Sequence, residues 1–145
     1  MGVDLVLVVE DTDEDIEAIG RAIGRSHPDT RLEFLRSGPQ VLPRLRRRPL
    51  PQVVLLDLNM PGEGGLDVIK QVRAVPGLAG VRLVVFTSSE SQAEAEACYA
   101  AGADSYVYKP INFALFRSVL SRTLDYWENV TQTVVPPPGD SVAQA

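Results

Sequence analysis

The sequence has few of the residues that mark specialised classes of protein. One cysteine, Cys98, stands in 145 residues, so an internal disulfide is excluded and a reducing, cytoplasmic setting is expected. No apolar run approaches the roughly 20 residues that a transmembrane helix needs, and the first residues lack the basic segment of a signal peptide. The formal net charge of -5 disfavours a nucleic-acid-binding module. We therefore expect a cytoplasmic protein that engages neither membrane nor DNA.

Length and composition favour one folded domain. Hydrophobic residues make up 45% and charged residues 23% of the chain, which is ordinary for a globular protein. We predict a domain over residues 1–127 and a C-terminal extension over residues 128–145. Three consecutive prolines favour extended backbone in that extension, which we expect to form an arm on a partner subunit and a disordered end.

Short apolar runs alternate with segments of helical spacing. The runs with strand character are Leu5–Val9, Leu32–Leu35, Val53–Leu56, Arg82–Phe86 and Ser105–Tyr108. Five helices are predicted between and after them; Asp13 is the expected N-cap of the first, and Gly102 is expected to end the fourth. This alternation predicts an α/β fold with a doubly wound, flavodoxin-like sheet of five parallel strands, five helices and an extended C-terminal tail.

Polar residues follow four of the predicted strands. Glu10 and Asp11 follow the first strand, Asp57 ends the third, Thr87 the fourth and Lys109 the fifth. The carboxyl ends of parallel strands meet at one edge of the sheet, where doubly wound domains bind their ligands. The sequence therefore predicts that these residues form one site.

The chemistry of that site follows from its charges. Glu10, Asp11 and Asp57 bring three negative charges, which Mg²⁺ and Lys109 together balance. Mg²⁺ takes oxygen ligands and commonly combines a few carboxylates with phosphate oxygens. A carboxylate can attack phosphorus to form an acyl phosphate, and the central strand makes Asp57 the best-placed nucleophile. Lys109 and the Thr87 hydroxyl are predicted to contact the phosphoryl oxygens.

Four segments carry a resemblance to a known family. VVEDTDED, LLDLNMPGEGG, VVFTSS and GADSYVYKP, in that order, resemble the receiver domain of two-component response regulators over about residues 4–124. The resemblance implies that Asp57 accepts a phosphoryl group from a sensor histidine kinase. It also implies a Mg²⁺ site formed by Glu10, Asp11, Asp57 and the backbone carbonyl of Asn59.

The resemblance further implies how the domain switches. Thr87 and Tyr106 match the family's switch pair, Lys109 matches its phosphate-binding lysine, and a cis peptide is expected between Lys109 and Pro110. Phosphorylation is expected to draw Thr87 inward and let Tyr106 turn from an exposed to a buried position. The surface made by the fourth helix, fifth strand and fifth helix would repack as a result.

The expected biological role is that of a phosphorylation switch. No DNA-binding output domain is expected after the receiver, and the chemistry is limited to the protein's own phosphorylation and dephosphorylation, so it is not expected to be an enzyme. The DLNMPG and FTSSES segments resemble the small regulators paired with bacterial phytochrome kinases. A homodimer through the fourth helix, fifth strand and fifth helix is expected.

The same residues are compatible with other interpretations. An aspartate-nucleophile phosphatase of the haloacid dehalogenase type would use Asp11, because the segment after the first strand contains D-x-D. An EF-hand loop is disfavoured because its sixth position is Ile16 and its twelfth is Ala22. Asp11 or Asp13 could also act as simple helix caps, and Arg44–Arg48 is predicted to be a solvated helix end.

Overall fold

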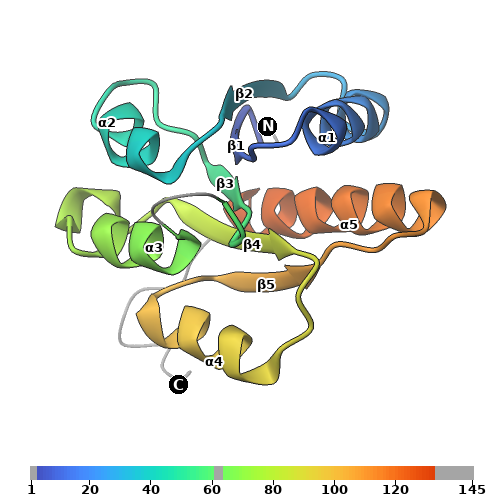
Figure 1. Ribbon diagram of the computed structural model, residues 1–145. Helices are drawn as coiled ribbons and strands as arrows, with labels where there is room; N and C mark the ends of the chain where they lie inside the picture. The colour runs from blue at the N-terminus through green and yellow to red at the C-terminus, as the bar shows by residue number, and fades with distance from the viewer. Residues whose placement is uncertain (1–2, 61–63, 133–145) are drawn as a thin grey trace, which may run out of the picture.

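The computed structural model contains one parallel β-sheet (Figure 1). It describes residues 3–60 and 64–132. The strands are β1 (Leu5–Val9), β2 (Arg31–Leu35), β3 (Val53–Leu56), β4 (Arg82–Thr87) and β5 (Ser105–Tyr108). Their spatial order is β2-β1-β3-β4-β5, with every neighbouring pair parallel. The predicted doubly wound, flavodoxin-like fold is confirmed.

Helices cover both faces of the sheet. On one face α1 (Asp13–Ser26) lies beside α5 (Phe113–Gln132), and on the other lie α2 (Val41–Leu45), α3 (Gly65–Arg73) and α4 (Gln92–Ala101) (Figure 1). Two short 3₁₀ turns, Gly38–Gln40 and Pro76–Leu78, precede α2 and β4. None of the helices in the described part of the chain is long and apolar enough to cross a membrane.

Burial on two faces explains the continuous apolar runs. Along β1, Val6 and Val8 pack with the core under α1 and α5, whereas Leu7 and Val9 pack with the core under α2, α3 and α4. All five residues of β1 and all four of β3 are buried. Strands with both faces covered need apolar side chains at successive positions, which is why these runs do not alternate.

The ends of two helices test the sequence-based caps. Thr12, rather than Asp13, is the N-cap of α1: its hydroxyl oxygen accepts the N–H of Asp15, and Asp13 is the first helical residue. The prediction for α4 is confirmed, since Gly102 follows the helix in the left-handed region with φ 118°. A Cβ at Gly102 would also lie 2.5 Å from Cγ of Arg73.

Helix α5 is longer than the sequence predicted. It continues through Gln132, five residues beyond the expected domain end at Trp127. Val130, one turn after Trp127, packs against the core under α1 and α5 and so continues the apolar face of the helix. The first residues of the predicted extension are therefore helical. The predicted arm and disordered end, residues 133–145, lie outside the described residues.

Candidate functional site

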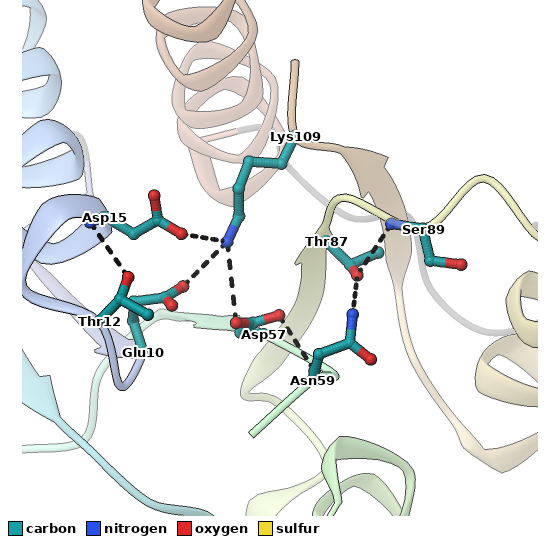
Figure 2. Close-up of polar contacts among 8 residues, drawn as sticks. All are labelled: Glu10, Thr12, Asp15, Asp57, Asn59, Thr87, Ser89 and Lys109. Carbon is teal, nitrogen blue, oxygen red and sulfur yellow. Dashed lines mark hydrogen bonds and ion pairs between the residues drawn. The ribbon is translucent and has the colours of Figure 1, made fainter. Parts of the chain in front are cut away.

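The candidate site lies at the carboxyl ends of the central strands (Figure 2). In the strand register Val9 is opposite Leu56, so the next residues, Glu10 and Asp57, lie side by side. A cavity of about 840 Å³ opens there, lined in part by Glu10, Asp11, Asp57, Asn59 and Lys109. The structure thus brings together five of the residues that the sequence assigned to one site.

Three carboxylates of this site are arranged to hold a cation. One oxygen each of Glu10, Asp11 and Asp57 lie within 4.8 Å of one another. Glu10 is 1% exposed, and its Oε2 has no hydrogen-bond partner among the described residues. Burial raises the pKa of Glu10 to about 7; the positive charge of Lys109 opposes this shift and the negative charge of Asp57 adds to it. An orphaned oxygen among hard carboxylate donors fits a divalent metal such as Mg²⁺.

Lys109 places its ammonium among the acidic groups. Its Nζ lies 2.8 Å from Oδ2 of Asp15, 3.0 Å from Oε1 of Glu10 and 3.8 Å from Oδ2 of Asp57. Burial alone would lower the pKa of Lys109, but the hydrogen bond to Asp15 and the charges of Asp57 and Glu10 outweigh burial and raise the pKa. Lys109 is therefore a permanent cation at the mouth of the acidic cluster.

The Asp57 carboxylate is also held from the side of β4. The N–H of Asn59 donates to Oδ1 of Asp57 at 3.1 Å, and the side-chain amide of Asn59 donates to Oγ1 of Thr87 at 3.4 Å. Thr87 is fully buried, and its Oγ1 also accepts the N–H of Ser89 at 3.3 Å. Asn59 thereby links the carboxylate of Asp57 to the hydroxyl of Thr87 (Figure 2).

Helix α3 begins close to the backbone that carries Asp57. A Cβ on Gly65 would lie 2.9 Å from Cα of Leu58 and 3.1 Å from the carbonyl oxygen of Asp57. Glycine at this position lets the first turn of α3 pack directly against the end of β3.

Ser89 links Tyr106 to Thr87 through two hydrogen bonds. The hydroxyl of Tyr106 donates to the carbonyl of Ser89 at 3.1 Å and lies 3.4 Å from Oε1 of Glu94. The ring is half-buried and packs against the core under α2, α3 and α4. Ser89 therefore donates its N–H to Thr87 and accepts from Tyr106. The sequence did not assign Ser89 this role, which depends on the path of the β4–α4 loop.

The predicted cis peptide between Lys109 and Pro110 is wrong. Among the described residues the cis peptide bond is Arg48–Pro49, and the bond before Pro110 is trans. An X-Pro bond still favours trans by about 0.5–1 kcal/mol, so proline permits a cis peptide but does not require one.

Two residues of the site were missed or left unassigned by sequence reasoning. Asp15, to which the sequence assigned no role in the site, makes a shorter hydrogen bond with Lys109 than Glu10 does. Arg36, from the loop after β2, donates to the Asp11 carbonyl at 3.3 Å and pairs with Asp13. Asp15 lies four residues after Asp11, in the first turn of the predicted helix, and that closeness to the end of the first strand is a signal that could have placed it at the same end of the sheet.

Comparisons with known proteins agree with this geometry. A family model described as a response regulator receiver domain matches residues 6–121. A probable methanogenesis regulatory protein, FilR2 of Methanothrix harundinacea, is 33% identical over 128 residues, which cover 85% of this chain and 83% of that protein. The response regulator Rcp1 of Synechocystis is 29% identical over 134 residues, covering 88% of this chain and 91% of Rcp1.

Solved structures of similar proteins have the same fold. The response regulator RPA3017, described in red light signaling of R. palustris, matches with a TM-score of 0.81 and 28% identity, covering 93% of this chain and 99% of that one. The Mn²⁺-bound form of Rcp1 matches with a TM-score of 0.79 and 26% identity, covering 92% and 99%.

Proposed function

Because the chain belongs to the response regulator receiver family, we propose that Asp57 accepts a phosphoryl group from a sensor histidine kinase. The observation that carries this assignment is the position of the Asp57 carboxylate. It is 7% exposed, lies in the carboxylate cluster with Glu10 and Asp11, and has Lys109 3.8 Å away. A buried acid at the centre of a cation-binding cluster, open to a cavity, is suited to attack phosphorus.

The transfer itself is an in-line displacement. An oxygen of Asp57 forms the new bond to phosphorus, the P–N bond of the donor phosphohistidine breaks, and its electron pair returns to the imidazole nitrogen, which becomes protonated from solvent. Mg²⁺, held by Glu10, Asp11, Asp57 and the carbonyl of Asn59, would screen the carboxylates and the phosphoryl charge. Lys109 binds one phosphoryl oxygen, and the Thr87 hydroxyl donates to another. The chemistry is limited to the protein's own modification and its reversal, as in a switch rather than an enzyme.

The hydrogen bonds around Ser89 offer a route from Asp57 to the surface. A phosphoryl group on Asp57 would accept the O–H of Thr87 and draw the Thr87 side chain toward Asp57. The oxygen of that hydroxyl accepts the N–H of Ser89, so this movement pulls on Ser89. Movement of Ser89 changes the carbonyl that Tyr106 binds and therefore the packing between α4 and β5. We take Thr87 and Tyr106 as the switch pair on this basis.

A phytochrome-type kinase is the proposed partner. Rcp1 and RPA3017 align along nearly their whole lengths, and RPA3017 is described in red light signaling. By analogy, we propose that this chain acts in light signalling. We also propose that it is cytoplasmic, where the kinase and Mg²⁺ are both available.

The proposed output is a protein contact rather than a DNA contact. Tyr99 of α4, Tyr108 of β5 and Tyr126 of α5 are large exposed side chains, the hydroxyl of Tyr99 accepts the N–H of Tyr106, and β5 is an edge strand. This α4–β5–α5 face is the proposed homodimer surface. The net charge of -5 would oppose an approach to DNA.

The assignment of Asp57 is tested by intact-protein mass after incubation with acetyl phosphate and Mg²⁺. Wild type is expected to gain one phosphoryl group, Asp57→Asn to gain none, and Asp11→Asn to gain it more slowly through weakened metal binding. Label that persists in Asp57→Asn but is absent from Asp11→Asn would instead support a phosphatase-type nucleophile at Asp11.

A further inference from the structure

A fourth carboxylate, that of Asp15, belongs to the cavity around Asp57. Its backbone is fixed in the first turn of α1, where its N–H bonds the cap residue Thr12. Its side chain turns toward Lys109, and the 2.8 Å contact to Nζ is shorter than that of Glu10 or Asp57 (Figure 2). Asp15 is not among the residues assigned above to the metal or to the phosphoryl group.

We propose that Asp15 is a positioning residue, which together with Glu10 holds Lys109 so that its remaining N–H is directed at a phosphoryl group on Asp57. The role rests on the proposed function of Asp57. A lysine ammonium has three N–H donors and no acceptor. Asp15 and Glu10 accept two of them, at 2.8 Å and 3.0 Å. The third faces Asp57.

The distance to Asp57 supports this division of the donors. At 3.8 Å, Oδ2 of Asp57 lies beyond hydrogen-bond range of Nζ. A phosphoryl group on Asp57 adds a phosphorus atom and further oxygens beyond the carboxylate, and these can fill the gap without any movement of Lys109. A donor that needs no rearrangement at the moment of reaction stabilises the transferred group best.

A second consequence concerns the metal. Lys109 shares Glu10 and Asp57 with the proposed Mg²⁺ site, and a cation bound to these carboxylates competes with Mg²⁺. Asp15 binds the Lys109 ammonium through a carboxylate that is not part of the cluster of Glu10, Asp11 and Asp57, and so reduces this competition. Without Asp15, Lys109 would shift onto Glu10 and Asp57, so both Mg²⁺ and the phosphoryl group would bind less tightly.

A neighbouring acid provides the matched control. Asp13 lies in the same first turn of α1 and interacts equally with the positive end of the helix dipole, but it is 85% exposed and pairs with Arg36. If Asp15 served only the helix, Asp13→Asn and Asp15→Asn would have the same effect on the site.

The experiment is calorimetric titration with beryllofluoride, a phosphoryl mimic, in saturating Mg²⁺, with a separate titration of Mg²⁺ alone. We expect Asp15→Asn to weaken beryllofluoride binding by about tenfold, because the neutral amide oxygen holds the Lys109 ammonium less strongly than the carboxylate does. Asp13→Asn is expected to weaken it by less than about twofold. Asp15→Glu, which keeps the charge, is expected to retain most of the affinity. Thermal unfolding checks that each variant folds, and Asp15→Ser is the second neutral variant.

Coupling to Lys109 separates positioning from a general charge effect. If Asp15 acts through Lys109, the effect of Asp15→Asn disappears in a Lys109→Met background. A full effect in that background, or equal effects of Asp13→Asn and Asp15→Asn in wild type, would overturn the role of Asp15 while leaving Asp57 as acceptor. A wild type that binds no beryllofluoride would overturn the proposed function and the role of Asp15 together.

Discussion

Charged side chains are buried at both ends of the β-sheet, but their partners differ. At the carboxyl end, three carboxylates contact Lys109, Asp11 adds a fourth negative charge beside two of them, and Oε2 of Glu10 lacks a partner among the described residues. Near the amino ends of β3 and β4, two arginines bind carboxylates and backbone carbonyls. The first region has an excess of negative charge, whereas in the second region each of the two carboxylates is paired with an arginine.

Arg44 and Arg73 are the two arginines near the amino ends of β3 and β4. Arg44, 3% exposed, binds both oxygens of Glu33 and the carbonyls of Arg47 and Pro49. Arg73 binds the carboxylate of Asp104 and three carbonyls, those of Gly102, Leu78 and Val81. Such satisfied groups stabilise the fold, whereas the excess of carboxylates at the other end, with one unpartnered oxygen on Glu10, leaves a site that would gain stability by binding a cation.

The largest expected effect is at Arg44. Arg44→Met keeps the aliphatic stem but leaves the two carbonyls and Glu33 without their donor, and should lower the free energy of unfolding by about 3 kcal/mol. Urea denaturation followed by circular dichroism measures the change. Arg21→Met is the control, because the Arg21–Glu17 pair is exposed and should cost less than about 0.5 kcal/mol. Equal effects of the two variants would remove the distinction between the regions.

An Asp→Asn substitution should change the free energy of unfolding in opposite directions at the two ends of the sheet. In Mg²⁺-free buffer, Asp57→Asn removes repulsion from Glu10 and Asp11 and should raise the free energy of unfolding by about 1 kcal/mol. Asp104→Asn weakens its bonds to Arg73 and to the N–H of Leu83 and should lower it by about 1–2 kcal/mol. Added Mg²⁺ should stabilise wild type more than Asp57→Asn, which has one fewer carboxylate for the metal. If both variants were less stable than wild type in Mg²⁺-free buffer, repulsion between carboxylates would not destabilise the carboxyl end of the sheet.

The smallest expected effect is a pH dependence from Glu33. The hydrogen bond from Arg44 lowers the pKa of Glu33 below its ordinary 4.5. The unfolded chain therefore binds a proton more readily than the folded one, and the contribution of Glu33 to stability is present above pH 4.5 and is lost as the pH falls below it. Glu33→Gln should flatten the acid side of the stability profile measured by urea denaturation. A profile that keeps the wild-type slope would show that Glu33 is not the group that titrates.

Much of the fold could be predicted because its signals are local. A strand covered on both faces requires a continuous apolar run, as in Val53–Leu56, and a glycine after a helix marks its end, as at Gly102. The convergence of Glu10, Asp57 and Lys109 followed from the parallel topology alone. A residue that directly follows a strand can be placed in such a sheet once the strand itself has been recognised in the sequence.

The remaining features depend on contacts between distant segments. Arg44 begins a basic run that predicts a solvated helix end, but its partner Glu33 lies on β2 and makes it a buried residue. The sequence spacing can place Asp15 at the correct end of the sheet, but its role depends on a contact with the tip of Lys109, 94 residues later. The continuation of α5 beyond Trp127 depends on the contact of Val130 with the core, which the sequence does not reveal.

The central claim is that Asp57 carries the phosphoryl group, and its most direct test is to locate the modified residue. Protein treated with acetyl phosphate and Mg²⁺ is reduced with borohydride, which converts an aspartyl phosphate to homoserine, and is then digested and sequenced by tandem mass spectrometry. We predict homoserine at position 57 and unmodified Asp11 and Asp15. Homoserine at position 11 with an intact Asp57 would contradict the account.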